Sequence, residues 1–362
     1  MANRILLGSE AFKQQLELRA SSATQSFYAQ AMTFEGDAAG EWLLEVMRSS
    51  PAKDKRLIVD CYSKVVINDH FVWSSKYLLD KDFRAEVKNT GKALRGAVND
   101  GIKVIFTNPV GFFGQKYPLR NHKKLILLDE KISYLGGINF SEHNFEWHDM
   151  MIESEDQELG RCLAADIRHT CAGVNQSRKE VTKAGELYLF NGIASKQLYE
   201  DLFDYVGQAQ KSIEIVSPYV SDPLLSVIRK VAGRGVAVTV ISPEENNKSI
   251  FKNLILAEFQ KGYFKLKEFK GMSHMKAILI DDSKLLYGSS NYDLVSYYFE
   301  QEVVMVSFDQ GLIAEFKERV FSEAIDVSDT SISRLGVFKA NILMKGLNGF
   351  GKAASSTFLK PR

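Results

Sequence analysis

Histidine, lysine, aspartate and asparagine recur in this sequence as two sets with identical spacing. In each set a lysine follows the histidine after two residues, an aspartate after seven and an asparagine after seventeen, and the second set lies 152 residues after the first. A single His-x-Lys is typical of a solvated strand face, but a matched pair is rare by chance in a chain with six histidines. We therefore interpret the sets as one duplicated motif. Its members are His122, Lys124, Asp129 and Asn139, then His274, Lys276, Asp281 and Asn291.

These residue types suit the cleavage of a phosphodiester. Residues two apart on a strand point to the same face, so each histidine is expected to share a face with its lysine. One imidazole can attack phosphorus and form a phosphohistidine, while the other, protonated, gives its proton to the departing alkoxide. Lysine and asparagine side chains can hold the non-bridging oxygens as charge develops. The predicted catalytic residues are His122, Lys124, Asn139, His274, Lys276 and Asn291.

Two further carboxylates are candidates for orienting the imidazoles. Asp149 and Glu302 lie 27 and 28 residues after the histidines of their halves, where an apolar strand pattern starts. A carboxylate that accepts a bond from one ring nitrogen fixes the tautomer of a histidine. Asp129 and Asp281 have the opposite strand parity to the histidines, so we assign them to anchoring bonds at the strand end and not to chemistry.

Metal binding is the competing interpretation of clustered histidines and carboxylates. A lysine two residues from each histidine argues against it, because an ammonium repels a divalent ion and cannot be a ligand while protonated. We therefore predict no metal and no other cofactor, and activity that persists in excess chelator.

The sequence around both motifs alternates between apolar strand patterns and helical patterns. Such alternation indicates β-α-β units with helices covering both faces of a sheet. The same order surrounds each motif, so an entire α/β layer is duplicated. We predict two tandem α/β domains over residues 1–180 and 190–329, with the boundary near residues 177–192, followed by a basic, partly apolar tail over residues 330–362.

Composition limits the class of protein. The chain has 362 residues, a formal net charge of +1 and 45% hydrophobic residues, which is ordinary for a globular protein. Three cysteines without CxxC spacing favour a reducing cytosol. No stretch approaches about 18 consecutive apolar residues, so we expect a cytoplasmic protein, with a peripheral position on the inner face of the membrane as one option. The near-neutral charge makes nucleic acid the less favoured partner.

The predicted tail differs from the rest of the chain in charge. It carries six lysines or arginines, no acidic residue and scattered leucine, isoleucine and phenylalanine. Such a segment can lie on an anionic membrane surface. The alternative is an unstructured terminus, because the glycines within it weaken any helix.

The duplicated motif resembles the signature of the phospholipase D superfamily, a His-x-Lys-x4-Asp followed by Gly-Gly-x-Asn or Gly-Ser-x-Asn. Within it, "IKVIFTNP", "RNHKKLILLD", "YLGGIN" and "WHD" are similar to the first half of bacterial cardiolipin synthases. The resemblance implies two α/β domains with mixed sheets, related by pseudo-twofold symmetry, with the active site at their interface. It also implies a phosphohistidine intermediate without a metal, with His122 as the nucleophile and His274 as the acid.

Departures from the subfamily pattern leave the head group and the acceptor alcohol open. Val295 stands where cardiolipin synthases usually carry arginine, and Glu300 where they carry asparagine. The sequence also lacks their usual pair of N-terminal membrane helices.

Three functions from different classes fit the sequence. The first is a phosphatidyltransferase or phospholipase that acts on a phospholipid substrate, with cardiolipin as one product. The second is a metal-independent nuclease of the same superfamily, which should show basic stripes with stacking aromatics along a groove. The third is a lipid-binding pseudoenzyme, which should show decay in one motif, whereas both keep histidine, lysine and asparagine.

Overall fold

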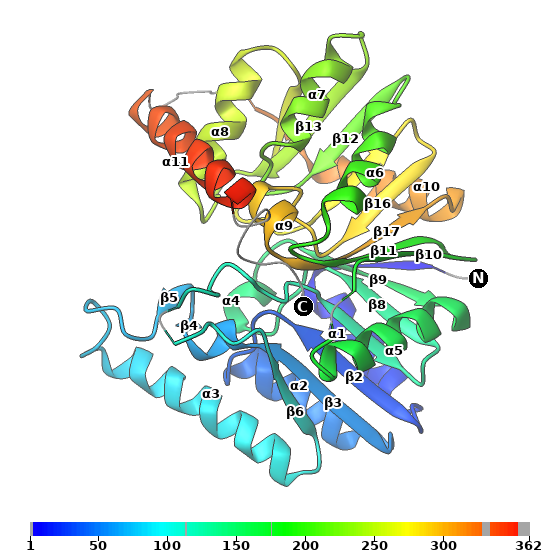
Figure 1. Cartoon of the computed structure of the whole chain (residues 1–362). Helices are drawn as coiled ribbons and strands as arrows, with labels where there is room; N and C mark the ends of the chain where they lie inside the picture. Colours follow the sequence, from blue (N-terminus) through cyan, green and yellow to red (C-terminus); the bar gives the residue numbers. More distant parts are fainter. Residues whose placement is uncertain (1–2, 113, 175, 328–333, 354–362) are drawn as a thin grey trace. The chain divides into compact units, whose positions relative to one another are not determined.

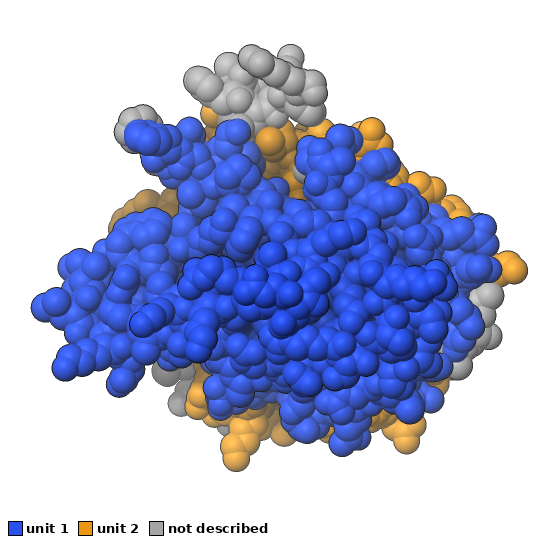
Figure 2. Space-filling model, turned by 90° about the horizontal axis from the view of Figure 1, so that it is seen from below, with its two compact units in different colours: residues 1–175 blue, residues 176–362 orange. Residues whose placement is uncertain are grey.

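The computed structural model divides the chain into two compact units, residues 1–175 and 176–362, which Figure 2 shows in separate colours. Each unit has a sheet and an apolar core of its own. The structure describes residues 3–112, 114–174, 176–327 and 334–353.

The described residues of the first unit form a seven-stranded sheet with the order β1-β9-β8-β7-β2-β3-β6. β2, β3 and β6 run parallel because a helix returns the chain between them, and the remaining neighbours are antiparallel. A short hairpin, β4–β5, stands apart from this sheet. The strands are β1 (Arg4–Leu7), β2 (Ser26–Ala31), β3 (Asp54–Asp60), β4 (Val66–Ile67), β5 (His70–Phe71), β6 (Lys103–Thr107), β7 (Leu125–Leu128), β8 (Ile132–Gly136) and β9 (Met150–Glu155).

Helices cover both faces of this sheet (Figure 1). α1, α2 and α3 bury residues such as Phe12 and Leu43 against Phe27 and Ile126 of the strands, and α5 packs on the other face against β6, β7 and β8. α2, α3 and α5 each follow an aspartate whose carboxylate accepts hydrogen bonds from the first-turn amides. The helices are α1 (Gly8–Ala20), α2 (Ala38–Ser49), η1 (Cys61–Lys64), α3 (Lys81–Asn99), α4 (Glu142–Phe145) and α5 (Gln157–Cys171).

The second unit repeats the strand order of the first. Its sheet runs β10-β11-β17-β16-β15-β12-β13-β14-β18, in which the seven strands from β11 to β14 correspond one for one to the sheet of the first unit. The predicted duplicated α/β fold with mixed sheets is therefore confirmed. The strands are β10 (Arg178–Thr182), β11 (Gly185–Asn191), β12 (Ser212–Val216), β13 (Ala237–Pro243), β14 (Lys265–Phe269), β15 (Ala277–Ile280), β16 (Lys284–Gly288), β17 (Gln301–Ser307) and β18 (Ile325–Asp326).

α6, α7 and α8 pack on one face of the second sheet, where Leu202, Ile228 and Ile255 meet Ile215 and Val304. The helices of this unit are α6 (Lys196–Gly207), α7 (Leu224–Ala232), α8 (Ser249–Gln260), α9 (Leu294–Tyr298), α10 (Gln310–Arg319), η2 (Phe321–Glu323) and α11 (Arg334–Ala353).

Two segments differ from the sequence-based expectation. Residues 178–191, which we expected to lie at the domain boundary, form the hairpin β10–β11, because Leu187 to Phe190 are buried on both faces of the second sheet. His122 and Lys124 lie before β7, which begins at Leu125, and not on a strand. The amide of Asn121, just before this segment, donates to the carboxylate of Asp60.

The predicted tail is helical over Arg334–Ala353, and its residues 330–333 and 354–362 lie outside the described residues. α11 forms despite its glycines because it packs on the second unit: Asn348 accepts a 3.0 Å hydrogen bond from the hydroxyl of Tyr298, and the ring of Phe350 lies 5.7 Å from that of Phe299. None of the helices that the structure describes has the length and apolar character needed to span a membrane.

Candidate active site

The residues before His122 are anchored by a buried ion pair. Arg120 Nη1 lies 2.6 Å from Asp60 Oδ1 at the end of β3, and both side chains are buried. The second carboxylate oxygen of Asp60 accepts from the Asn121 amide at 2.6 Å, and the Asn121 side chain accepts from Gln30 at 2.9 Å. Burial raises the pKa of Asp60 to about 7, against the opposing effects of Arg120 and the backbone amides. Asp60 thus ties the motif to the end of the neighbouring parallel strands.

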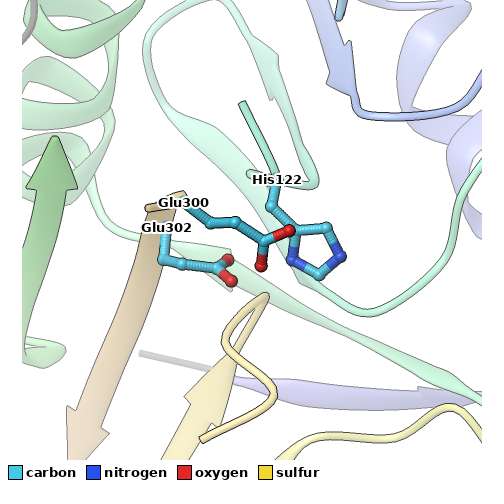
Figure 3. A group of neighbouring side chains, drawn as sticks. All are labelled: His122, Glu300 and Glu302. Carbon is cyan, nitrogen blue, oxygen red and sulfur yellow. The ribbon is translucent and has the colours of Figure 1, made fainter. Parts of the chain in front are cut away.

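A second buried ion pair anchors Lys123, the residue after His122. Figure 3 shows the side chain of His122. Lys123 Nζ lies 2.6 Å from Asp166 Oδ2 of α5, and both side chains are buried. Lys124 Nζ donates a 2.8 Å hydrogen bond to the carbonyl oxygen of His122. His122 is therefore flanked on both sides by residues with fixed side chains.

Asn139 is held by the loop that follows β2. Its Oδ1 accepts from the Thr33 amide at 3.3 Å, and its Nδ2 donates to Asn144 Oδ1 at 3.3 Å. The same loop is fixed by Ser63 of η1, which accepts from the Phe34 amide at 2.9 Å. These bonds fix the plane of the Asn139 amide, as a residue that positions an oxyanion requires.

The second motif repeats the local geometry of the first. Lys276 Nζ donates to the carbonyl oxygen of His274, the same contact that Lys124 makes with His122. The ring of Tyr219 stands edge-on to the imidazole of His274, with centroids 6.1 Å apart. The carbonyl oxygen of Asn291 accepts a 2.9 Å hydrogen bond from Ser217 after β12.

The two motifs differ in the charged residues that lie beside each histidine. The positions that correspond to Arg120 and Lys123 at the 152-residue offset hold Met272 and Met275. The two buried ion pairs beside His122 therefore have no counterpart beside His274. Methionine is flexible and uncharged, so the residues at these two positions of the second motif cannot form the ion pairs that flank His122.

Two acidic residues stand at the start of β17, Glu302 on the strand and Glu300 directly before it (Figure 3). Glu302 accepts hydrogen bonds from the hydroxyls of Ser289 and Ser296, the latter at 2.8 Å. Ser296 Oγ also lies 3.0 Å from Glu300 Oε2. Glu302 is fully buried, and these hydroxyls stabilise its carboxylate where a lone buried charge would be costly.

Asp149 occupies the matching place before β9 in the first unit. Its Oδ1 accepts from the amide of Met150 at 2.8 Å. A Cβ at Gly137 would lie 2.4 Å from that carboxylate, so only glycine fits there. The orientation of the imidazoles by Asp149 and Glu302 stays a prediction.

Asp129 and Asp281 make equivalent anchoring bonds at the far ends of β7 and β15. Asp129 accepts from the amides of residues 24, 25 and 26 at 2.9, 2.7 and 2.8 Å, and Asp281 accepts from residues 210, 211 and 212. Both aspartates adopt a left-handed backbone, with φ of 52°. A strand rises about 3.3 Å per residue, so each aspartate lies about 20 Å along the chain from its histidine.

Replacing Asp281 should lower stability in a pH-dependent way. Although burial acts to raise it, the three amides lower the pKa of Asp281 below its ordinary value of 3.8. A lowered pKa means that the stabilisation is complete above pH 4 and is lost as the pH falls through the folded pKa. We expect Asp281→Ala to cost about 2 kcal/mol at pH 7, since amide bonds to a charge and a tolerated left-handed residue are lost, and Asp281→Asn to cost less.

Urea unfolding at pH 7 and pH 3 measures this effect. The control is Asp282→Ala, which replaces an aspartate with the same φ of 52° and removes an exposed carboxylate 2.9 Å from Lys317. It should cost less than Asp281→Ala, because it loses a surface ion pair in place of the bonds to three amides. A pH-independent loss in Asp281→Asn would contradict the assignment.

Sequence reasoning missed the residues that anchor the first motif. Asp60 and Asp166 are 60 and 43 residues from their partners. One available signal was the Arg-Asn-His-Lys-Lys run, because two cations beside a buried strand need carboxylate partners.

Comparison with known proteins supports the family suggested by the motif. Residues 202–323 match the family described as "Cardiolipin synthase, PLD-like domain". The chain is 26% identical over 285 residues to "Probable cardiolipin synthase YwiE" of Bacillus subtilis, covering 70% of this chain and 56% of the relative. It is 26% identical over 263 residues to "Minor cardiolipin synthase ClsB" of the same organism, covering 66% of this chain and 64% of the relative. The alignments thus span less than two thirds of either relative.

Two solved structures share the fold across most of the chain. Phosphatidylserine synthase of Haemophilus influenzae Rd KW20 has a TM-score of 0.68 at 16% identity, covering 98% of this chain and 93% of that one. Polyphosphate kinase of Porphyromonas gingivalis has a TM-score of 0.60 at 11% identity, covering 97% of this chain and 56% of that one. These structures show that the chain has a fold found in phosphatidylserine synthase and polyphosphate kinase. Residues 202–323 of the second unit are similar to the cardiolipin synthase family, and over the longer alignments the chain is similar to bacterial cardiolipin synthases.

Proposed function

We propose that this chain is a phosphatidyltransferase or phospholipase of the phospholipase D type, acting on glycerophospholipids, with cardiolipin synthesis as the particular reaction. The observation that carries the proposal is the duplication of one local geometry, in which a lysine ammonium donates to the carbonyl of its own histidine directly before equivalent strands of two sheets with the same strand order. Two intact copies are what a two-step phosphoryl transfer needs.

The proposed reaction has two balanced steps. In the first, the imidazole of His122 attacks the phosphorus of the donor lipid, the bond to the head-group alcohol breaks, and His274 gives its proton to that alcohol. In the second, His274 takes a proton from the acceptor alcohol or from water, which attacks the phosphorus and releases His122. Lys124, Lys276 and the two asparagines hold the non-bridging oxygens in both steps.

The unequal anchoring of the histidines supports the assignment of these roles. A nucleophile must meet phosphorus in line and at close distance, so its position has to be well defined. The buried ion pairs of Arg120 and Lys123 hold the backbone on both sides of His122. An acid that follows a departing oxygen needs less restraint, and methionines occupy the two matching positions, 272 and 275, near His274.

A parallel assay tests the proposed substrate class. Purified protein is incubated with labelled phosphatidylglycerol, phosphatidylethanolamine or single-stranded DNA, each in excess EDTA, and the products are resolved. We expect turnover of a phospholipid without added metal, because both motif lysines disfavour a divalent ion. Cleavage of DNA alone would identify a nuclease, and binding of lipid without turnover would identify a pseudoenzyme.

The surface of α11 supports a membrane as partner. Ala340 and Gly351 face the second unit and are buried, whereas Leu335, Phe338 and Ile342 are 61%, 61% and 55% exposed. The exposed three recur at helical spacing, so they form one apolar stripe. The helix also carries Arg334, Lys339, Lys345 and Lys352 and no acidic residue. An apolar stripe flanked by cations suits the interface of an anionic bilayer.

Removing the apolar stripe should weaken membrane binding. The triple variant Leu335→Ser, Phe338→Ser and Ile342→Ser should lose at least tenfold in affinity for phosphatidylglycerol vesicles, since each side chain loses its transfer energy into lipid. Vesicle sedimentation measures the change. The control is Val181→Ser on β10, which removes a 70% exposed apolar side chain elsewhere. Equal binding by the triple variant and this control would contradict the proposal.

A further inference from the structure

The first unit contains an apolar cavity that the proposed reaction does not use. It has a volume of about 580 Å³ and lies between α3, the edge strand β6 and the segment from η1 to Val72. Its apolar lining includes Val87, Leu94 and Val98 of α3, Val104 and Phe106 of β6, and Ile67 of β4. A volume within about 300–1,000 Å³ is typical of sites for organic ligands.

Two cations border this cavity. Lys64 Nζ lies 3.5 Å from the ring centroid of Phe106, one of the lining residues. Arg95 belongs to the lining as well, and its guanidinium lies beside Gly91. None of the lining residues that the structure describes is acidic, and neither cation forms an ion pair within the described ranges. The cavity therefore combines an apolar interior with uncompensated positive charge at its border.

The surface next to the cavity is apolar too. Val72 lines the cavity, while its neighbours Phe71 and Trp73 are 46% and 61% exposed. Exposed aromatic side chains beside a pocket are suited to contact lipid at a membrane interface. Ser63 also lines the cavity, and it bonds Phe34 of the loop that holds Asn139. One lining residue of the cavity is thus hydrogen-bonded to the loop that positions a predicted catalytic residue of the same unit.

We propose that this cavity binds one acyl chain of the phospholipid substrate, with Lys64 and Arg95 at its border facing the anionic lipids of the surrounding bilayer. The assignment to the substrate rests on the proposed function. Acyl methylenes gain about 0.8 kcal/mol each on leaving water, so an apolar cavity of this size favours long-chain over short-chain lipid.

Gly91 permits a selective test. It lies on the cavity face of α3, and a Cβ there would meet only the end of the flexible Arg95 side chain, at 3.3 Å. Gly91→Leu should place a branched side chain in the cavity and obstruct an acyl chain, whereas Gly91→Ala adds one methyl group. Both replace a helix-weakening residue inside α3, so thermal unfolding should show no loss of stability in either variant.

The fluorescent fatty acid cis-parinaric acid serves as the probe. We expect its affinity to fall at least tenfold in Gly91→Leu and to remain within twofold of wild type in Gly91→Ala. Lys64→Gln with Arg95→Gln should weaken binding of the acid but not of its methyl ester. Unchanged binding of the probe by Gly91→Leu overturns the site.

Turnover then decides whether the occupant is the substrate. For dioleoyl phosphatidylglycerol we expect at least a tenfold rise in KM in Gly91→Leu, with unchanged turnover of the dihexanoyl lipid. Lost probe binding with unchanged KM for the long-chain lipid overturns the assignment to the substrate. The probe measurement needs no turnover, so failure of the proposed reaction remains distinguishable from failure of the cavity.

Discussion

Replacing His122 by alanine should abolish covalent labelling by a phospholipid whose phosphate carries a radiolabel. The nucleophile forms the new bond to phosphorus, so no intermediate can arise without it. His274→Ala should behave differently, because this imidazole protonates a poor leaving group and later activates the acceptor. With a nitrophenyl phosphodiester, whose leaving group needs no proton, His274→Ala should still form the intermediate and then retain the label.

Acid and base treatment identifies the adduct, since a phosphohistidine survives base and decomposes in acid. His70→Ala is the matched control, because it removes an exposed histidine of β5, outside both motifs, and should leave labelling unchanged. Accumulation of label in His122→Ala together with its loss in His274→Ala would reverse the two roles. Some activated diesters will label the wild type. If none of these labels either His122→Ala or His274→Ala, the hypothesis that only one histidine is the nucleophile is refuted.

Replacing Lys123 by methionine, the residue at the corresponding position of the second unit, should destabilise the protein by about 3–5 kcal/mol, because Asp166 would keep a buried charge without a partner. The double variant Lys123→Met with Asp166→Leu should recover most of this loss, since apolar residues of similar volume often replace a buried ion pair without cost. Urea unfolding of both variants measures the difference.

An exposed ion pair provides the control for this cycle. Lys131 lies 3.0 Å from Glu155, with 56% and 35% of the side chains exposed, so Lys131→Met should cost at most about 1 kcal/mol. A Lys123→Met variant that loses no more than this control would contradict the assignment. If the ion pair also holds His122, the stable double variant should have a lower kcat with little change in KM, because the ground-state contacts of the lipid remain.

The sequence alone determined the fold class and the candidate chemistry. A 152-residue offset that relates histidine, lysine, aspartate and asparagine at once requires a duplicated unit, and the two sheets have the same strand order. Alternating strand and helix patterns were sufficient for the α/β class because periodicity is a local property of the chain. The sequence also predicted that Asp129 and Asp281 make anchoring bonds, and each of them directly follows a short buried strand.

Other features depend on contacts between distant residues. Whether Arg120 and Lys123 would be solvated or paired depended on Asp60 and Asp166, which only the packing of β3 and α5 brings to them. The hairpin at residues 178–191 was not predicted, because its strand pattern is short and its charged residues resemble a linker.

The cavity beside α3 and the exposed stripe of α11 are decided by tertiary structure for the same reason. Val87, Leu94 and Val98 form an apolar helix face in the sequence, and such a face ordinarily packs in a core. Only the position of β6 and of the segment around Val72 leaves space against it. A sequence specifies which faces are apolar, but the arrangement of the neighbouring elements decides which of those faces are filled and which remain open to a ligand or a membrane.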